Sequence, residues 1–209
     1  MIKVALCDDH AMVRRGIRDT LSEAVDITVV GEAACYAEVR SLLRATPCDV
    51  LVLDLNLPGR GGLEILSSLR EEACPVRVLI VSMYAEDQFA IRCLRAGADG
   101  YLSKTGDPSE LVTAVRTLAS GRKYITPVVS EMLVSNLSTP AVPSLHDTLS
   151  ERELQTLLLI ASGKRLSEIA EELMLSPKTV SVYRARLLEK LKLSTNAELA
   201  VYAIRNNLV

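Results

Sequence analysis

Within the first 120 residues, short runs of branched aliphatic residues alternate with segments of helical periodicity, and this alternation constrains the fold most strongly. A continuous apolar run is typical of a strand buried on both faces of a sheet. Such strands alternating with helices predict an α/β doubly wound fold with five parallel strands. The predicted strands are Ile2–Cys7, Ile27–Ala33, Val50–Leu53, Arg77–Val81 and Gly100–Leu102. The predicted helices are Ala11–Val25, Tyr36–Thr46, Gly62–Glu72, Asp87–Ala96 and Pro108–Ser120.

From Leu149 to the end of the chain the periodicity is helical. Ser150 with Glu153 three residues later forms a capping box at the start of a helix. Further on, Ser176 is placed as an N-cap and Pro177 occupies the first helical position. A short helix, a tight turn and a second helix in this order are typical of a helix-turn-helix. We therefore predict an all-α four-helix helix-turn-helix domain.

Between these two patterns lies a segment with little periodicity. Residues Val128–Leu137 have a pattern that predicts one more helix. The segment Ser138–Asp147 that follows is rich in Ser, Thr and Pro, which predicts a linker. We therefore divide the chain into a domain over residues 1–122, a linker with a helix over 123–147, and a second domain over 148–209.

Charge is unevenly distributed along the chain. Residues 1–120 carry 13 basic and 17 acidic residues, whereas residues 121–209 carry 11 basic and 9 acidic ones. The net charge of −2 excludes a uniformly basic coat for nucleic acid. The asymmetry indicates a basic module attached to an acidic one.

The five cysteines show neither C-x-x-C pairs nor Cys/His metal spacing, so they predict buried thiols in a reducing compartment. Met1 leads directly into a strand pattern without a secretory leader. Apolar runs fall short of the roughly 20 residues that span a bilayer. We expect a cytoplasmic protein that does not contact a membrane.

Polar residues follow four of the five predicted strands. They are Asp8 and Asp9 after the first strand, Asp54 after the third, Ser82 after the fourth and Lys104 after the fifth. Ligands of an open parallel sheet bind at this carboxyl edge. Three carboxylates at one place repel one another and favour a hard divalent cation such as Mg²⁺. The lysine and the hydroxyl would contact an incoming phosphoryl group, and Asp54 is placed to act as the nucleophile.

A structural interpretation also exists for each of these residues taken alone. A polar residue at a strand end is often simply solvated, and Asp9 lies where it could cap the following helix. The complete set in strand order is harder to explain in this way, so we favour the chemical interpretation.

The segments CDDH, LDLNLPGRGG, VSMY and GYLSK resemble the receiver domain of two-component response regulators, which has a flavodoxin-like fold. The similarity extends over about residues 1–120. It implies that Asp54 accepts a phosphoryl group from a sensor histidine kinase. It also implies that Asp8, Asp9 and Asp54 bind Mg²⁺ together with the backbone carbonyl of Asn56.

The same resemblance implies roles for residues near the phosphoacceptor. Lys104 would contact the phosphate, Ser82 would hydrogen-bond the phosphoryl oxygens, and Tyr101 would change rotamer with it. Two positions depart from the usual pattern. Thr105 stands where many receiver domains have proline, and Met83 is bulkier than the residue that many of them have.

The segment SPKTVSVYRARLLEKLKL predicts the second helix of the helix-turn-helix. Val180, Tyr183, Leu187 and Leu191 recur every three or four residues and form one buried stripe. The predicted DNA-binding residues are Lys178, Thr179, Ser181, Val182, Arg184, Ala185, Arg186 and Lys190. Their cations would contact phosphates, and the small residues would face base edges, including thymine methyl groups. The alternative is a solvated basic face on an ordinary four-helix domain.

The segment from Leu149 to Leu193 resembles the LuxR-type DNA-binding domain of the NarL/FixJ family, and the similarity covers about residues 147–209. Tyr183 stands where relatives often have histidine. The resemblance implies double-stranded DNA as a partner, RNA polymerase as a further candidate partner, and a homodimer formed through the last helix. The predicted dimer contacts are Leu199, Ala200, Ala203 and Ile204. Alternatively, this helix only closes the core of its domain.

We therefore predict a DNA-binding transcriptional regulator controlled by phosphorylation, with self-phosphorylation and slow self-dephosphorylation as its only chemistry. One alternative is a phosphohydrolase with Asp54 as nucleophile, but the chain offers no positioned acid–base residue and no substrate cap. Another is a regulator that binds DNA independently of phosphorylation and has a vestigial pocket.

Overall fold

The structure, a computed structural model, describes residues 1–138, 145–206 and 208–209. Its N-terminal unit contains five parallel strands in the order β2-β1-β3-β4-β5. The strands are β1 (Ile2–Cys7), β2 (Ile27–Ala33), β3 (Val50–Asp54), β4 (Arg77–Ser82) and β5 (Gly100–Ser103). The order reverses direction at β1, so the carboxyl ends of β1 and β3 border the crevice where ligands of such sheets bind. The predicted α/β doubly wound fold is confirmed.

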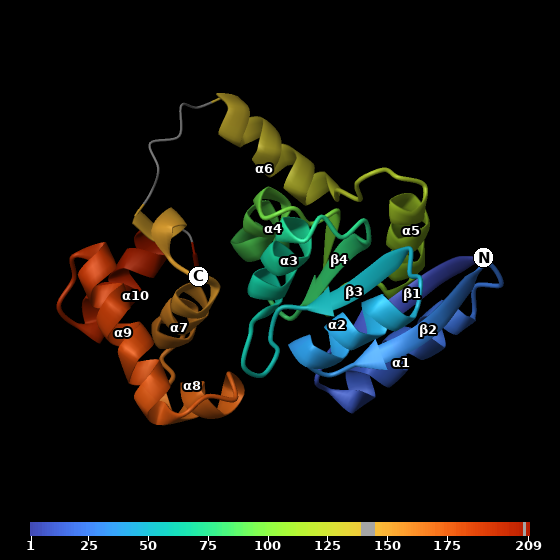
Figure 1. Cartoon of the computed structure of the whole chain (residues 1–209). Helices are drawn as coiled ribbons and strands as arrows, with labels where there is room; N and C mark the ends of the chain where they lie inside the picture. Colours follow the sequence, from blue (N-terminus) through green and yellow to red (C-terminus); the bar gives the residue numbers. More distant parts are fainter. Residues whose placement is uncertain (139–144, 207) are drawn as a thin grey trace. The chain divides into compact units, whose positions relative to one another are not determined.

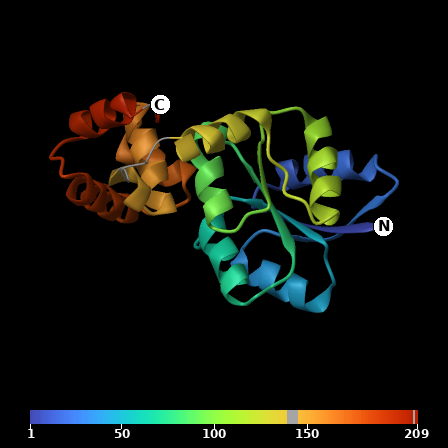
Figure 2. The same cartoon turned by 90° about the horizontal axis from the view of Figure 1, so that it is seen from above.

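Helices cover both faces of the sheet (Figures 1 and 2). Two of them, α1 (Ala11–Ser22) and α5 (Pro108–Ala119), lie together on one face. The other face is covered by α2 (Tyr36–Ala45), α3 (Gly62–Glu71) and α4 (Glu86–Arg95). The predicted helices are present, although α1 ends at Ser22, before the predicted end at Val25.

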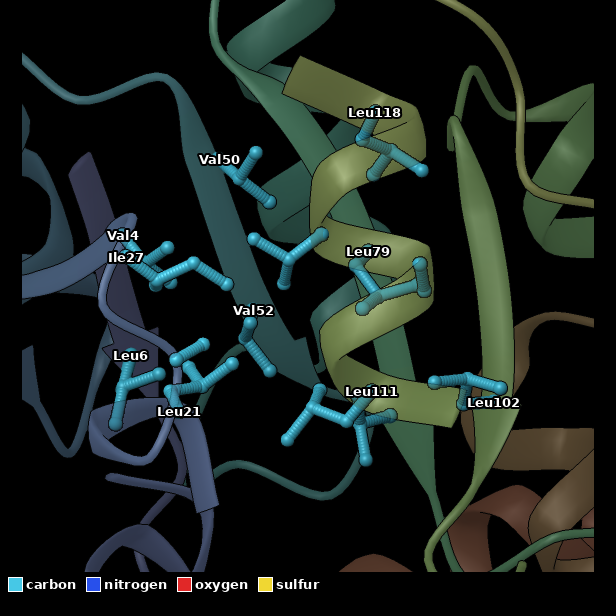
Figure 3. Close-up of a cluster of buried hydrophobic side chains, with 14 residues drawn as sticks. Val4, Leu6, Leu21, Ile27, Val50, Val52, Leu79, Leu102, Leu111 and Leu118 are labelled. Atoms are coloured by element: carbon cyan, nitrogen blue, oxygen red, sulfur yellow. The ribbon is translucent and has the colours of Figure 1, made fainter. Parts of the chain in front are cut away.

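The core between the sheet and the α1/α5 layer is aliphatic (Figure 3). Val4, Val52 and Leu79 project from the strands toward Leu111 and Leu118 of α5. All five residues of β3 are buried, because helices cover both faces of this central strand. Burial on both faces explains why β3 is a continuous aliphatic run and why the carboxylate at its end is the exception.

A further helix, α6 (Pro127–Ser138), belongs to this unit and packs beside α4 (Figure 1). The segment before it pairs with the edge of the sheet, where the Tyr124 amide donates to the Asp99 carbonyl at 2.9 Å. The Thr126 hydroxyl donates to the carboxylate of Glu86 at the start of α4. The first compact unit therefore extends to Ser138, into the predicted linker. Residues 139–144 of that linker lie outside the described residues.

The second unit is helical, as predicted. A short 3-10 helix η1 (Leu145–Thr148) precedes four α-helices. They are α7 (Glu151–Ala161), α8 (Leu166–Glu172), α9 (Pro177–Leu191) and α10 (Asn196–Arg205). The Ser150 and Glu153 capping box forms at the start of α7. His146 in η1 lies 3.0 Å from the Tyr202 hydroxyl, which ties η1 to α10.

Candidate functional site

The predicted polar residues meet at the carboxyl edge of the sheet. Lys104 follows β5, and its Nζ lies 2.6 Å from Asp8 Oδ2 and 2.9 Å from Asp54 Oδ2. These three side chains are almost completely buried, with exposed fractions of 8%, 4% and 2%. The backbone amide of Lys104 donates to the carbonyl of Ser82 at 2.7 Å, which fixes the end of β5 against β4. One ammonium group therefore stands between two buried carboxylates.

Burial and two neighbouring charges shift the pKa of Asp54. Burial raises the pKa of Asp54 to about 6, Lys104 lowers it, and the neighbouring Asp8 raises it again. For Lys104, burial alone would lower the pKa, but the pairing with Asp54 and Asp8 raises it above its usual value. At neutral pH Asp54 is therefore largely ionised beside a charged lysine, which is the state a nucleophilic carboxylate needs.

A divalent cation fits the acidic side of this site. Asp8, Asp9, His10 and Asp54 each offer a ligand atom, and these atoms lie within 4.8 Å of one another. Asp9 Oδ1 and Asp54 Oδ2 are buried and lie 2.9 Å from His10 Nδ1 and Lys104 Nζ, respectively. The single ammonium group of Lys104 does not balance three carboxylates, and buried carboxylates are costly unless cations compensate their charge. Carboxylate oxygens are ligands that Mg²⁺ prefers.

Sequence reasoning missed His10 and Arg14. The His10 amide donates to Asp8 Oδ1 at 2.7 Å, and its ring Nδ1 lies 2.9 Å from Asp9 Oδ1. Arg14, one turn into α1, donates to the backbone carbonyl of Asp8 and lies 3.2 Å from Glu32. His10 follows the acidic pair directly, so its position in the sequence was a usable signal. Arg14 gave no such signal.

Ser82 and Tyr101 are connected through the segment that follows β4. Ser82 is completely buried, and the Tyr84 amide lies 3.3 Å from its Oγ. The Tyr101 side chain is 2% exposed and its hydroxyl donates to the Tyr84 carbonyl at 2.8 Å. A movement of Ser82 would therefore reach Tyr101 through the backbone of Tyr84. Met83, between Ser82 and Tyr84 in the chain, is 62% exposed, so its side chain lies at the surface.

The two remaining predicted positions lie in loops beside the site. The backbone amide of Asn56, two residues after Asp54, donates to the Asp54 carboxylate and lowers its pKa. The Thr105 hydroxyl lies 2.8 Å from Ser103 Oγ, and the Lys104–Thr105 peptide bond is trans.

In the helical unit, α8 and α9 form the helix-turn-helix. Ser176 caps α9 by accepting from the Thr179 amide at 3.0 Å, with Pro177 at the first helical position. Val180 and Leu187 are fully buried on one face. The opposite face is exposed and carries Lys178, Ser181, Val182, Ala185 and Arg186. Thr179 and Arg184 are half-buried at its border.

Lys190, one of the predicted DNA contacts, has an ionic partner within its own domain. Its Nζ lies 2.7 Å from Glu153 Oε2 and 3.3 Å from the carbonyl of Thr148. Glu153 is buried, so Lys190 neutralises a charge inside its own domain. Lys190 remains 39% exposed, so its contact with phosphate stays a prediction. Arg184 is engaged as well, since its Nε donates to Asn196 Oδ1.

The predicted dimer contacts divide into two groups. Leu199 and Ala203 are completely buried, because α10 packs against α7 along this face. They are therefore core residues, which corrects their assignment to a dimer contact. Ala200 is half-buried, Ile204 is 60% exposed, and Val201, which was not predicted, is 47% exposed.

Both parts of the chain match known families. Residues 4–116 match the response regulator receiver domain, and residues 147–203 match the luxR family of bacterial regulatory proteins. The chain therefore belongs to the NarL/FixJ family of two-component response regulators. It is a phosphorylation-regulated, DNA-binding transcription regulator, and its receiver domain implies a histidine kinase as partner. Neither matched family is an enzyme family, which argues against the phosphohydrolase alternative.

Among its relatives is the response regulator UvrY of Escherichia coli K12, which is 40% identical over 209 residues. That similarity covers all of this chain and 96% of UvrY. The response regulator GacA of Pseudomonas aeruginosa is 39% identical over 210 residues, covering all of this chain and 98% of GacA.

Two solved structures extend the comparison. A LuxR-family response regulator from Aurantimonas is 36% identical, with a TM-score of 0.60 over 66% of this chain and 98% of that protein. The response regulator RcsB, solved as a complex with DNA, is 26% identical, with a TM-score of 0.60 over all of this chain and 98% of RcsB. Within the described residues, no helix is both long and apolar enough to cross a membrane.

Proposed function

We propose that Asp54 is the phosphoacceptor of this regulator. Its carboxylate attacks the phosphorus of a phosphohistidine on the kinase, the phosphorus–nitrogen bond breaks, and the histidine nitrogen leaves. The observation that carries this proposal is the position of Asp54, which is buried at the end of β3 and lies 2.9 Å from Lys104. The ammonium of Lys104 then neutralises the phosphoryl oxygens.

Asp8, Asp9 and Asp54 would hold a Mg²⁺ ion, with the backbone carbonyl of Asn56 as a further ligand. When bound, the ion neutralises charge on the phosphoryl group during transfer. The ligand atoms of Asp8, Asp9, His10 and Asp54, which lie within 4.8 Å of one another, support this assignment. The same site would support slow hydrolysis of the acyl phosphate, and we expect no turnover of other phosphate esters.

Intact mass after incubation with Mg²⁺ and acetyl phosphate tests the assignment, with Asp54→Asn beside the wild type. We expect the wild type to gain one phosphoryl group and the variant to gain none. A phosphoryl group on the variant would place the acceptor elsewhere. No gain by the wild type, from acetyl phosphate or from a phosphorylated kinase, would favour a vestigial pocket.

Ser82 and Tyr101 would carry the signal away from Asp54. A phosphoryl group on Asp54 would accept a hydrogen bond from the Ser82 hydroxyl, and Ser82 would move toward Asp54 to donate it. This movement of Ser82 would shift the Tyr84 amide, which now lies 3.3 Å from Ser82 Oγ. The Tyr84 carbonyl is the acceptor for the Tyr101 hydroxyl. Two rotamers of Tyr101 then correspond to two states of the receiver domain.

The exposed face of α9 would read the operator. Arg186 and Lys178 would contact phosphates, whereas Val182 and Ala185 would lie against base edges and favour thymine methyl groups. Exposure of all four side chains on one face supports this orientation. The regulator would act on chromosomal DNA, and therefore in the cytoplasm, and RNA polymerase is a further proposed partner.

We further propose a homodimer on paired half-sites, formed through the exposed face of α10. Val201 and Ile204 are exposed apolar residues on that helix, and Ala200 borders them. Because they are three residues apart, Val201 and Ile204 lie on the same face of α10, and a contiguous apolar surface of this kind suits a contact with another chain. Paired half-sites would double the phosphate and base contacts of a single domain.

A further inference from the structure

The loop that connects β3 to α3 begins at the phosphoacceptor and is fixed at both ends. Leu55 and Leu57 are completely buried. At the far end, the Gly62 amide donates to the Leu55 carbonyl at 2.8 Å. A Cβ atom at Gly62 would lie 2.3 Å from the Asp54 carbonyl oxygen, so the loop returns directly onto the phosphoacceptor backbone. The position of this loop is therefore linked to the position of Asp54.

The middle of the loop has a different contact. Gly59 adopts a positive φ of 77°, and the exposed Arg60 follows it. The guanidinium carbon of Arg60 lies 4.5 Å from the centre of the Tyr36 ring. This distance is well within the range of a cation–π interaction. Tyr36 is the first residue of α2, so the contact joins the β3–α3 loop to the start of that helix.

The Tyr36 ring is itself held in place. Arg40, one turn later in α2, lies 5.7 Å from the centre of the same ring and approaches the Tyr36 hydroxyl at 3.3 Å. Arg40 also pairs with Glu72 at 2.7 Å, beside the end of α3. The ring thus forms a supported surface on which Arg60 stacks.

We propose that the Tyr36–Arg60 stack is a positioning contact for the magnesium site. It restrains the middle of the loop whose start carries Asn56, the residue proposed to offer its carbonyl to the metal. Neither side chain touches the metal or the phosphoryl group in this role. The inference rests on the proposed magnesium site, and it assigns a function to two residues that lie outside the acidic cluster.

The test compares variants of the full-length protein by three measurements. Calorimetric titration gives the dissociation constant for Mg²⁺, and hydrogen exchange of residues 56–61 without metal reports the restraint on the loop. The rate of phosphorylation by a phosphorylated kinase shows whether Arg60 contacts the kinase instead. Arg60→Ala and Tyr36→Leu remove the stack, whereas Tyr36→Phe keeps the ring and serves as the matched control. Arg60→Lys keeps the charge without the planar group.

We expect Arg60→Ala and Tyr36→Leu each to weaken Mg²⁺ binding about two- to five-fold, since an exposed cation–π contact contributes about 0.5–1 kcal/mol. Hydrogen exchange of the loop amides should be faster in both variants. The double variant should bind Mg²⁺ no more weakly than either single variant, because both substitutions remove the same contact. Tyr36→Phe should match the wild type in Mg²⁺ affinity and in loop exchange. Arg60→Lys should bind Mg²⁺ less tightly than the wild type, because stacking and not charge alone is required.

Unchanged Mg²⁺ affinity and loop exchange in Arg60→Ala and Tyr36→Leu would overturn the inference and leave the proposed function intact. Slower phosphorylation by a kinase with unchanged Mg²⁺ affinity would also overturn it, because Arg60 would then be a kinase contact. A wild type that binds no Mg²⁺ and gains no phosphoryl group would instead refute the proposed function itself.

Discussion

Lys104 Nζ lies 2.9 Å from Asp54 Oδ2, although the two residues stand 50 positions apart in the chain. The parallel sheet makes this contact, because β3 and β5 both end at the same edge, on either side of β4. The pairing keeps a buried carboxylate largely ionised near neutral pH and holds it beside a positive charge. Both properties suit a phosphoacceptor.

Removal of the Lys104 charge should destabilise the receiver domain in a magnesium-dependent way. Lys104→Met leaves Asp8 and Asp54 buried without a counter-charge, so we expect the free energy of unfolding at pH 7.5 to fall by roughly 2–4 kcal/mol. Millimolar Mg²⁺ should restore part of this loss, because the ion replaces the missing positive charge. Urea unfolding with EDTA and with Mg²⁺ measures both values. Equal stability of variant and wild type in EDTA would contradict the prediction.

The raised pKa of Asp54 predicts a pH-dependent stability in the absence of metal. Between pH 3.8 and about 6 the unfolded chain loses its Asp54 proton while the folded protein retains it. Stability from this group is therefore fully present below pH 3.8 and is lost as pH rises to about 6. The loss should amount to roughly 2–3 kcal/mol.

Subtracting the unfolding free energy of Asp54→Asn at each pH isolates this contribution, because the other titrating groups are common to both proteins. A difference that stays constant between pH 4 and pH 7 would show that Asp54 has an ordinary pKa. Above pH 7 the same difference should be flat.

Arg186 and Lys190 should behave differently although both are basic residues of α9. Arg186→Ala should weaken operator binding and lower the slope of log affinity against log salt by about 0.9 for each recognition helix. Lys190→Ala should leave that slope unchanged but lower the free energy of unfolding by roughly 1–2 kcal/mol, because Glu153 loses its partner. Fluorescence anisotropy across a salt series, together with thermal unfolding, distinguishes the two. Equal slopes for both variants would return Lys190 to the DNA face.

Substitutions at two aliphatic residues of α10, Leu199 and Ile204, should separate folding from dimerisation. Leu199→Ala removes a completely buried side chain and should destabilise the helical domain by about 2–5 kcal/mol. Ile204→Lys changes a side chain that is 60% exposed, so the fold should persist while the dimer and binding to paired half-sites weaken. Sedimentation of the phosphorylated protein and footprinting provide the readout. A dimer unaffected by Ile204→Lys would place the interface elsewhere.

Much of the site followed from the sequence because it depends on local chemistry. Asp8 directly follows the apolar strand β1, Asp54 and Ser82 end β3 and β4, and a parallel sheet necessarily brings such strand ends to one edge. The cap at Ser176 and the buried stripe through Val180 and Leu187 likewise depend on residues within one or two helical turns. A pattern with a fixed period identifies these features before any tertiary contact is known.

Tertiary structure alone decided which partners the long side chains have. The pairing of Lys190 with Glu153 appears only once α7 lies beside α9, and Leu199 looked like a dimer residue until α10 packed on α7. The stacking of Arg60 on Tyr36 joins the β3–α3 loop to the start of α2, two segments that no periodicity relates. The physical reason is the same each time. Periodicity specifies the face on which a residue lies, but only the packing of segments distant in sequence determines what that face meets.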